Sequence, residues 1–470
     1  MDKPVKAVRK KRPRRTFTPA FKAEAVRLCR IGDLSIAQVA KDLDLTETAL
    51  RERVHRADVD AGKGPAEGAW IGLRQRGYPH GFPKTQVFLM ADLNGVHEPR
   101  IALFLPNLAG GGAERAFVEL GNRFALMGCK VDMVLAKGGG GYLPEVSPAV
   151  RVIALGGNRT LASVLKLRRY IRSQRPTVVM SGLDTANVSN WLACWLAGVP
   201  HAAVLTQRSV LSRMWHASYP RSAWIWIRVL ALFYRRAHCV ISNSQAVADD
   251  LITTLGVRPG RVTVIHNSVD VATISRLAAQ PVEHDWVSQE AAPLILLVGS
   301  LTKAKDIPTT LRAFARLRKE RDCRLLVLGE GPDRVMLEEF IRKLGIQDSV
   351  LLNGFDLNPF RWMARAGALV SSSPSEGCPN VILQALACGL PVVATDGQGG
   401  TSEILENGRW GRLVPVGDDQ ALAVAIAEIL DAPRAIDVAA HISRFDPARV
   451  ALLYLSRILP GWEAKTGKGS

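Results

Sequence analysis

The chain has 470 residues, 47% of them hydrophobic, and a formal net charge of +18 at pH 7. This length is too great for one hydrophobic core, and the apolar content excludes a largely disordered chain, so we expect two large domains and a smaller part. The charge favours acidic partners, such as nucleic acid, anionic lipid or phosphorylated substrates. Seven scattered cysteines, without a metal-ligand spacing, exclude a disulfide scaffold and indicate a reducing compartment.

The N-terminal segment is strongly basic, with eight Lys or Arg in residues 3–15. No apolar run of signal-peptide length follows it, and no stretch reaches 18 uninterrupted apolar residues, so the sequence predicts neither export nor a membrane-spanning helix. We therefore expect a cytoplasmic protein, either soluble or peripheral on the inner face of the cell membrane.

Residues 18–57 are predicted to form three short helices, because a capping residue precedes each apolar period. The turn between the second and third helices has the spacing of a helix-turn-helix, whose last helix enters the DNA major groove. That helix carries three cations: Arg51, Arg53 and Arg56. One prediction is therefore DNA binding through residues 1–61, and the alternative is a three-helix unit with a solvated charged face.

Residues 17–66 resemble the start of the small helix-turn-helix subunit of insertion-sequence transposases. The resemblance stops before Gly68, and the catalytic acidic residues of a transposase are not evident downstream. Residues 62–98 show no helical or strand period and contain several Gly and Pro, so we interpret them as a linker. Our hypothesis is that an insertion element left its first codons fused to the gene for the rest of the chain.

Short apolar runs alternate with helical patterns from residue 99 onward. The first run, 100–106, is followed by Gly110, Gly111 and Gly112 and then by a predicted helix over 113–127. Six further runs follow at 131–136, 150–155, 177–182, 201–205, 239–244 and 261–267. This alternation predicts a parallel sheet covered on both faces, and hence a Rossmann-like domain over 99–285.

One helical pattern of this domain has an unusual composition. Residues 222–236, SAWIWIRVLALFYRR, combine aromatic and aliphatic side chains with three arginines, a pattern that suits the surface of an anionic membrane. The alternative is a helix that packs one apolar face on the sheet.

The alternation starts again with runs at 294–299, 324–329, 350–353, 368–372 and 391–395. These runs predict a second Rossmann-like domain over 286–460. The predicted fold class is therefore α/β, with two Rossmann-like domains facing a cleft and a small all-α helix-turn-helix at the N-terminus. Because ligands of such sheets bind at the carboxyl ends of the strands, we expect functional residues in the turns after these runs.

The segment 371–403, SSSPSEGCPNVILQALACGLPVVATDGQGGTSE, gives the most specific indication of a binding site. Glu376 follows a buried strand, Gly377 permits close approach, and the backbone amides of Asn380 and Val381 would point out of a helix N-terminus. Such a helix end attracts phosphate.

A diphosphate carries about two negative charges against roughly half a positive charge at a helix end, so a cation must supply the rest. Lys305 is the candidate. The chain has no P-loop and no paired acidic metal motif, because Asp418 and Asp419 adjoin a surface-like helix, so we expect neither a metal nor another cofactor. The histidines at 201, 216, 238 and 266 are assigned no catalytic role.

Five segments in chain order resemble the family-four glycosyltransferases of the GT-B fold, over residues 99–460. They are LPNLAGGGAERAFVELGNRFALMGCKVDMV, SNSQAVADDLI with RVTVIHNSVD, GSLTKAKDIPTTLRAF, LVLGEGP and SEGCPNVILQALACGLPVVATDGQGGTSEIL. The resemblance implies transfer of a sugar, with retention, from a nucleoside-diphosphate donor to a hydroxyl of a glycan or lipid-linked acceptor in cell-surface polysaccharide synthesis. It also implies that Glu376 contacts donor-sugar hydroxyls, that Lys305 contacts the diphosphate, and that the loop 110–112 faces the same cleft.

Two positions depart from the family's pattern. Gln384 stands where the family has a second Glu for the ribose, which we expect to cost about 1 kcal/mol, or roughly fivefold, in donor affinity. Ser300 stands where the family commonly has an Arg against the diphosphate, and Lys303 is a less suitable replacement because it is a flexible point charge. These two departures raise one alternative to an active transferase, an inactive nucleotide-binding homologue. The other alternative, which rests on residues 1–61, is a transposase-derived DNA-binding protein.

Overall fold

The computed structural model of the protein describes residues 99–460, apart from residues 110, 158, 219–221, 288–291 and 432–437. The predicted helix-turn-helix with Arg51, Arg53 and Arg56, the linker 62–98 and Gly110 lie outside the described residues. The predictions made for them are therefore neither supported nor contradicted by the structure.

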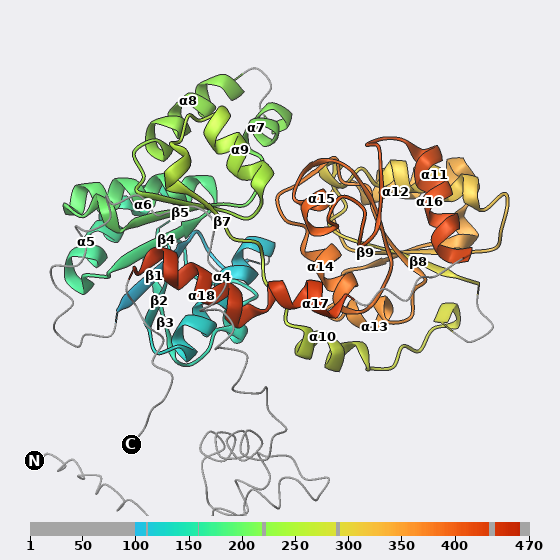
Figure 1. The fold of residues 1–470 in the computed structure, drawn as a ribbon, viewed down its shortest axis with the longest axis horizontal. Helices are drawn as coiled ribbons and strands as arrows, with labels where there is room; N and C mark the ends of the chain where they lie inside the picture. Colours follow the sequence, from blue (N-terminus) through green and yellow to red (C-terminus); the bar gives the residue numbers. More distant parts are fainter. Residues whose placement is uncertain are drawn as a thin grey trace, which may run out of the picture. The chain divides into compact units, whose positions relative to one another are not determined.

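The first sheet contains seven parallel strands in the order β3-β2-β1-β4-β5-β6-β7 (Figure 1). The strands are β1 (Arg100–Leu105), β2 (Lys130–Leu135), β3 (Val150–Ala154), β4 (Val178–Gly182), β5 (Ala203–Gln207), β6 (Cys239–Ser242) and β7 (Val262–Val264). Each of the seven predicted apolar runs supplies one of them. The strand order reverses direction between β1 and β4, which is the topological switch of a Rossmann-type sheet.

Helices cover both faces of this sheet. They are α4 (Gly112–Leu126), α5 (Val164–Gln174), α6 (Asp184–Ala197), α7 (Leu211–Ser218), α8 (Ala223–Tyr234) and α9 (Gln245–Thr253). In α4, Phe117, Leu120 and Phe124 recur at helical spacing and are buried, so this face packs on the sheet. In α9, the Ser244 hydroxyl accepts a hydrogen bond from the amide of Val247 and caps the first turn.

The second sheet contains six parallel strands in the order β10-β9-β8-β11-β13-β15. The strands are β8 (Leu294–Val298), β9 (Arg324–Leu328), β10 (Val350–Gly354), β11 (Ala368–Ser371), β13 (Val392–Thr395) and β15 (Arg412–Val414). The two Rossmann-type sheets confirm the predicted α/β class for this part of the chain. The short strands β12 (Ser375–Glu376), β14 (Gln398–Gly399) and β15 were not predicted, because two or three residues show no strand period.

We call the first sheet with the helices that pack on it the first half, and the second sheet with its helices the second half. The helices of the second half include α11 (Ile307–Leu317), α12 (Arg334–Leu344), α13 (Phe360–Met363), α14 (Asn380–Ala387), α15 (Thr401–Ile404), α16 (Asp419–Asp431) and α17 (Ala439–Ile442). Two further helices pack across the predicted division of the chain. They are α10 (Val271–Ala278), which lies beside α13 and α14, and α18 (Pro447–Ile458), which lies beside α4 (Figure 1). Ile274 on α10 lies in a core with strands of the second sheet. Tyr454 on α18 lies in a core of the first sheet and meets Phe124 edge-on.

The predicted domain ranges 99–285 and 286–460 stay a prediction, and sequence alone could not assign α10 and α18 to one sheet or the other. An apolar period tells which face of a helix is buried, and not which sheet covers it.

Candidate active site

Glu376 and Lys305 are 71 positions apart in the chain, yet the structure brings them together. The Lys305 ammonium donates a hydrogen bond to Glu376 Oε1, and both side chains keep some exposure, 25% for Lys305 and 19% for Glu376. Lys305 ends a single helical turn that follows β8, and Glu376 belongs to β12, which follows β11. Both residues therefore come from carboxyl ends of adjacent strands of the second sheet.

The loop that carries Lys305 is fixed from beneath. The buried Ser372 hydroxyl lies 2.9 Å from the carbonyl oxygens of Lys305 and Asp306, and it accepts a hydrogen bond from Thr310 at 2.9 Å. A Cβ at Gly299 would lie 3.4 Å from Lys305 Cε, so the lysine stem also packs on the end of β8. These contacts orient the ammonium toward the carboxylate.

Glu376 is held by its pairing with β14. The amide of Gly400 donates to the Glu376 carbonyl at 2.9 Å, and a Cβ at Gly399 would lie 1.5 Å from that same oxygen. Gly399 also has a φ of +135°, a conformation that side chains of L residues rarely adopt. Only glycine at 399 therefore permits the β12–β14 pairing that fixes the Glu376 backbone.

The predicted phosphate-binding end of α14 lies beside the first sheet's glycine loop. A Cβ at Gly112 would lie 3.6 Å from Asn380 Nδ2, and one at Gly377 would lie 1.9 Å from the carbonyl oxygen of Arg208. Gly111 precedes α4, where a Cβ would lie 2.3 Å from the Glu114 carboxylate. The structure therefore places Gly112, Gly377 and Asn380 at one contact between the two halves.

The remaining predicted residues lie around this contact. Val381 follows Asn380 in α14 and packs against the core of the second sheet, and Gln384 lies one turn further on, partly exposed. Ser300 is exposed just after β8, with its hydroxyl 3.5 Å from that of Thr302.

A second contact between the halves centres on Glu403, which the sequence analysis did not single out. Its carboxylate accepts hydrogen bonds from the amides of Gln245 (2.8 Å) and Ala246 (3.0 Å) at the start of α9, and it lies 3.0 Å from His266 Nε2. Burial alone would raise the pKa of Glu403, but these hydrogen bonds outweigh it and hold the pKa below its ordinary value of 4.5. The one sequence feature that could have indicated this contact is the position of His266, just past the end of β7.

Replacing Glu403 by Gln is expected to destabilise the protein by about 2 kcal/mol at neutral pH, because charge-assisted hydrogen bonds to a helix N-terminus are lost. Since the folded-state pKa is lowered, the carboxylate's contribution to the free energy of unfolding is present above pH 4.5 and is lost as the pH falls through the folded-state pKa. Melting of wild type and variant from pH 7 down to pH 3 should therefore show a difference that shrinks with acidification. A difference independent of pH would contradict this assignment.

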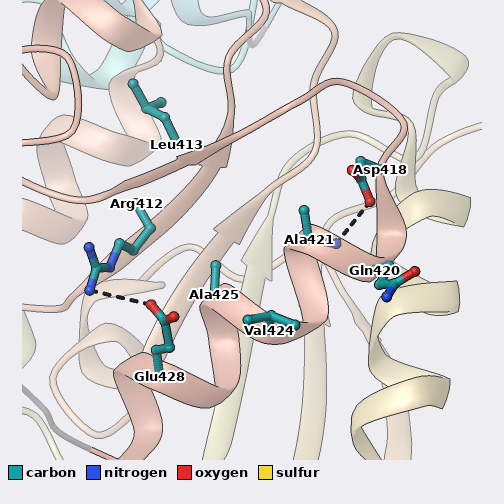
Figure 2. A pocket seen from close by; sticks show the side chains of 8 residues that line it. All are labelled: Arg412, Leu413, Asp418, Gln420, Ala421, Val424, Ala425 and Glu428. Atoms are coloured by element: carbon teal, nitrogen blue, oxygen red, sulfur yellow. Dashed lines mark hydrogen bonds and ion pairs between the residues drawn. The ribbon is translucent and has the colours of Figure 1, made fainter.

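Within the described residues, no group of three or more His, Cys, Asp or Glu side chains is arranged to hold a metal ion. Asp419 instead pairs with Arg316 and Arg312 on α11. A shallow hollow between β15 and α16, beside Asp418, is drawn in Figure 2. None of the predicted binding or catalytic residues lines it.

Two Rossmann-type sheets that bring the carboxyl ends of their strands to one contact, with an ion pair and a helix N-terminus beside it, have the architecture of the GT-B fold. Residues 110–273 match the model of Glycosyltransferase Family 4, and residues 292–432 match that of Glycosyl transferases group 1. The chain belongs to this family of retaining glycosyltransferases.

Two curated relatives span most of the described part. An N-acetylgalactosamine-N,N'-diacetylbacillosaminyl-diphospho-undecaprenol 4-alpha-N-acetylgalactosaminyltransferase of Campylobacter jejuni is 27% identical over 339 residues, covering 71% of this chain and 90% of the relative. The lipopolysaccharide core biosynthesis glycosyltransferase LpsE of Rhizobium meliloti is 26% identical over 329 residues, covering 68% and 86%.

Solved structures share the fold. Anabaena Alr3699/HepE in complex with UDP superposes with a TM-score of 0.62 at 21% identity, covering 76% of this chain and 98% of that one. A glycosyltransferase from Rickettsia africae superposes with a TM-score of 0.62 at 20% identity, covering 78% and 100%. At these identities the likeness concerns the GT-B fold.

Proposed function

We propose that this enzyme transfers a hexose from a nucleoside-diphosphate sugar to a hydroxyl of a glycan or lipid-linked acceptor, in the synthesis of a cell-surface polysaccharide. The observation that carries the proposal is the ion pair between Glu376 and Lys305 at the strand ends beside α14. The names of the two relatives support the acceptor class, since one acts on an undecaprenol-linked sugar and the other in the lipopolysaccharide core.

The residues of the site divide into two proposed roles. Glu376 accepts hydrogen bonds from the hydroxyls of the donor sugar, and Lys305 neutralises the diphosphate. Five further groups line the donor: Gly377, the amides of Asn380 and Val381, the loop of Gly110, Gly111 and Gly112, Gln384 at the ribose, and Ser300. In the reaction, the bond between the anomeric carbon and the diphosphate oxygen breaks, the acceptor oxygen bonds to that carbon on the same face, and the acceptor's proton passes to the departing phosphate.

A screen of nucleotide sugars by thermal shift tests this proposal, because a ligand of the folded state raises the melting temperature by mass action. The best binder is then incubated with membrane lipid extract and the labelled product is measured. An active enzyme both binds and transfers, whereas an inactive homologue binds without transfer. A chain that binds no nucleotide sugar would overturn the proposal. The DNA-binding alternative would rest on residues 1–61 alone, and the family matches lie outside that segment.

A surface on α8 supports the finer proposal that the enzyme is cytoplasmic and works at the inner face of the membrane. Trp224, Ile225 and Trp226 are 55%, 45% and 44% exposed, and the Arg228 guanidinium lies 5.2 Å over the Trp224 ring. Residues 146–248 contain thirteen Lys or Arg and a single acidic residue, Asp184. Exposed tryptophans among arginines suit an anionic lipid surface. No helix within the described ranges is long and apolar enough to cross a bilayer.

Changing Trp224 and Trp226 to Ser is expected to lower cosedimentation with phosphatidylglycerol vesicles at least about fivefold, because two aromatic anchors no longer enter the interface. The matched control changes Phe355 and Leu357, which are 72% and 88% exposed in the second half, to Ser. Equal binding of wild type and the tryptophan variant would contradict membrane contact through α8.

A further inference from the structure

Asn267 bridges the two halves of the enzyme with its side-chain amide. It follows β7, is only 7% exposed, and accepts a hydrogen bond from the Arg208 guanidinium on Oδ1. Its Nδ2 donates to the Cys378 carbonyl oxygen at 3.0 Å and to Asn380 Oδ1 at 2.6 Å. Each hydrogen-bonding atom of this amide therefore has a partner.

The chemistry of Arg208 fixes the polarity of this chain of contacts. A guanidinium donates hydrogen bonds and accepts none, so the atom of Asn267 that faces Arg208 must be its oxygen. The Asn267 nitrogen then faces the second half. Because that nitrogen is only a donor, the atom of Asn380 that meets it must be the oxygen.

Asn380 is consequently left with its amide nitrogen facing the predicted donor site. A Cβ at Gly112 would lie 3.6 Å from Asn380 Nδ2, so this nitrogen points toward the glycine loop at the start of α4. Among the described residues, Asn380 Nδ2 has no hydrogen-bond partner of its own. It is an oriented donor at the N-terminus of α14, where backbone amides favour an anion.

Arg208 is itself held in place. The Tyr454 side chain of α18 hydrogen-bonds with its guanidinium, and the Asn243 side-chain amide donates to its carbonyl oxygen at 3.3 Å. Because Gly377 has no side chain, the second half can approach the carbonyl oxygen of Arg208 closely. The guanidinium therefore has a fixed direction toward Asn267.

We propose that Arg208 and Asn267 are positioning residues that set the side chain of Asn380 as a hydrogen-bond donor to the phosphates of the nucleotide sugar. We call these three residues the amide relay. The inference rests on the proposed function, because that function places a diphosphate beside α14. Since Arg208 and Asn267 follow strands of the first sheet and Asn380 is the first residue of α14 in the second half, the donor is oriented only while the halves are in contact.

Asn267→Asp tests the relay. The new carboxylate accepts the Arg208 hydrogen bond as an ion pair, which offsets the loss of the donor to the Cys378 carbonyl oxygen, so the fold should be kept. The carboxylate offers no donor to Asn380. Asn380 would then turn its nitrogen toward this carboxylate and its oxygen toward the phosphate. We expect binding of the nucleoside diphosphate to weaken about tenfold or more, as for a lost hydrogen bond to a charged group, while the protein stays folded.

A double-mutant cycle separates the effect of turning the Asn380 side chain from the effect of the negative charge that Asn267→Asp adds. Dissociation constants for UDP, GDP or dTDP, whichever wild type binds best, are measured for wild type, Asn380→Ala, Asn267→Asp and the double variant. The relay predicts that Asn380→Ala weakens wild-type binding about tenfold and the Asn267→Asp background less than twofold. Equal effects in both backgrounds would overturn it.

Three further outcomes are assigned in advance. If Asn267→Asp does not fold, Arg208→Met takes its place, because it frees Asn267 to rotate, and the cost of Asn380→Ala should again shrink. If wild type binds none of the three nucleotides, the proposed function fails and the relay with it. If wild type binds and Asn380→Ala changes nothing, the relay alone fails.

Discussion

Glu376→Gln is expected to lower the rate of sugar transfer at least about 100-fold. The substitution preserves size and one hydrogen-bond acceptor, but it removes the charge that faces Lys305 and, in the proposed complex, the donor sugar. Loss of one preoriented electrostatic group in an active site typically costs a factor of about 10² to 10³ in turnover. Initial rates with saturating donor, measured beside the melting temperature, test this expectation.

The control for Glu376→Gln is another carboxylate paired with a cation. Glu338 on α12 forms a hydrogen-bonded ion pair with Arg334 at 2.9 Å, and its side chain is 45% exposed. An exposed pair of this kind contributes little to stability, so Glu338→Gln should leave both the rate and the melting temperature unchanged. Transfer by Glu376→Gln at half the wild-type rate or more would remove Glu376 from the catalytic assignment.

Features that repeat along the chain could be predicted from the sequence. The apolar runs of both halves became strands because a parallel strand buried on two faces needs an uninterrupted apolar segment. Glu376 and Lys305 could be named because each follows such a run, at the edge where ligands of doubly wound sheets bind. Their direct contact needed the fold, since 71 positions separate them in the chain.

The contacts between the halves could not be predicted in the same way. Glu403 and His266 each carry an ordinary polar side chain, and only the fold brings them within 3.0 Å. The amide relay is likewise made of three common residues. Its proposed function depends on whether the oxygen or the nitrogen of each side-chain amide faces the next residue. The partner of such residues lies in another domain, so no local period or spacing encodes it.

Gly377→Ala is expected to reduce transfer about 100-fold while leaving each half folded. A Cβ at this position would lie 1.9 Å from the carbonyl oxygen and 2.7 Å from the carbonyl carbon of Arg208, both backbone atoms that cannot turn aside. The third close atom, Asn243 Oδ1 at 2.9 Å, also belongs to the first half. The three atoms nearest to the methyl group therefore all lie across the contact, and the halves must separate to admit it.

A displacement of about 1 Å at a reacting centre can cost a factor of about 10² in rate, which sets the expected size of the effect. The matched control is Gly260→Ala, because no atom lies within 4 Å of a Cβ at that position. Rates and melting temperatures of both variants are compared with wild type. The separation also releases Asn267 from Asn380, so binding of the nucleoside diphosphate should weaken with the rate. If Gly377→Ala transferred sugar as fast as Gly260→Ala, the contact between the halves would not be the arrangement in which the reaction occurs.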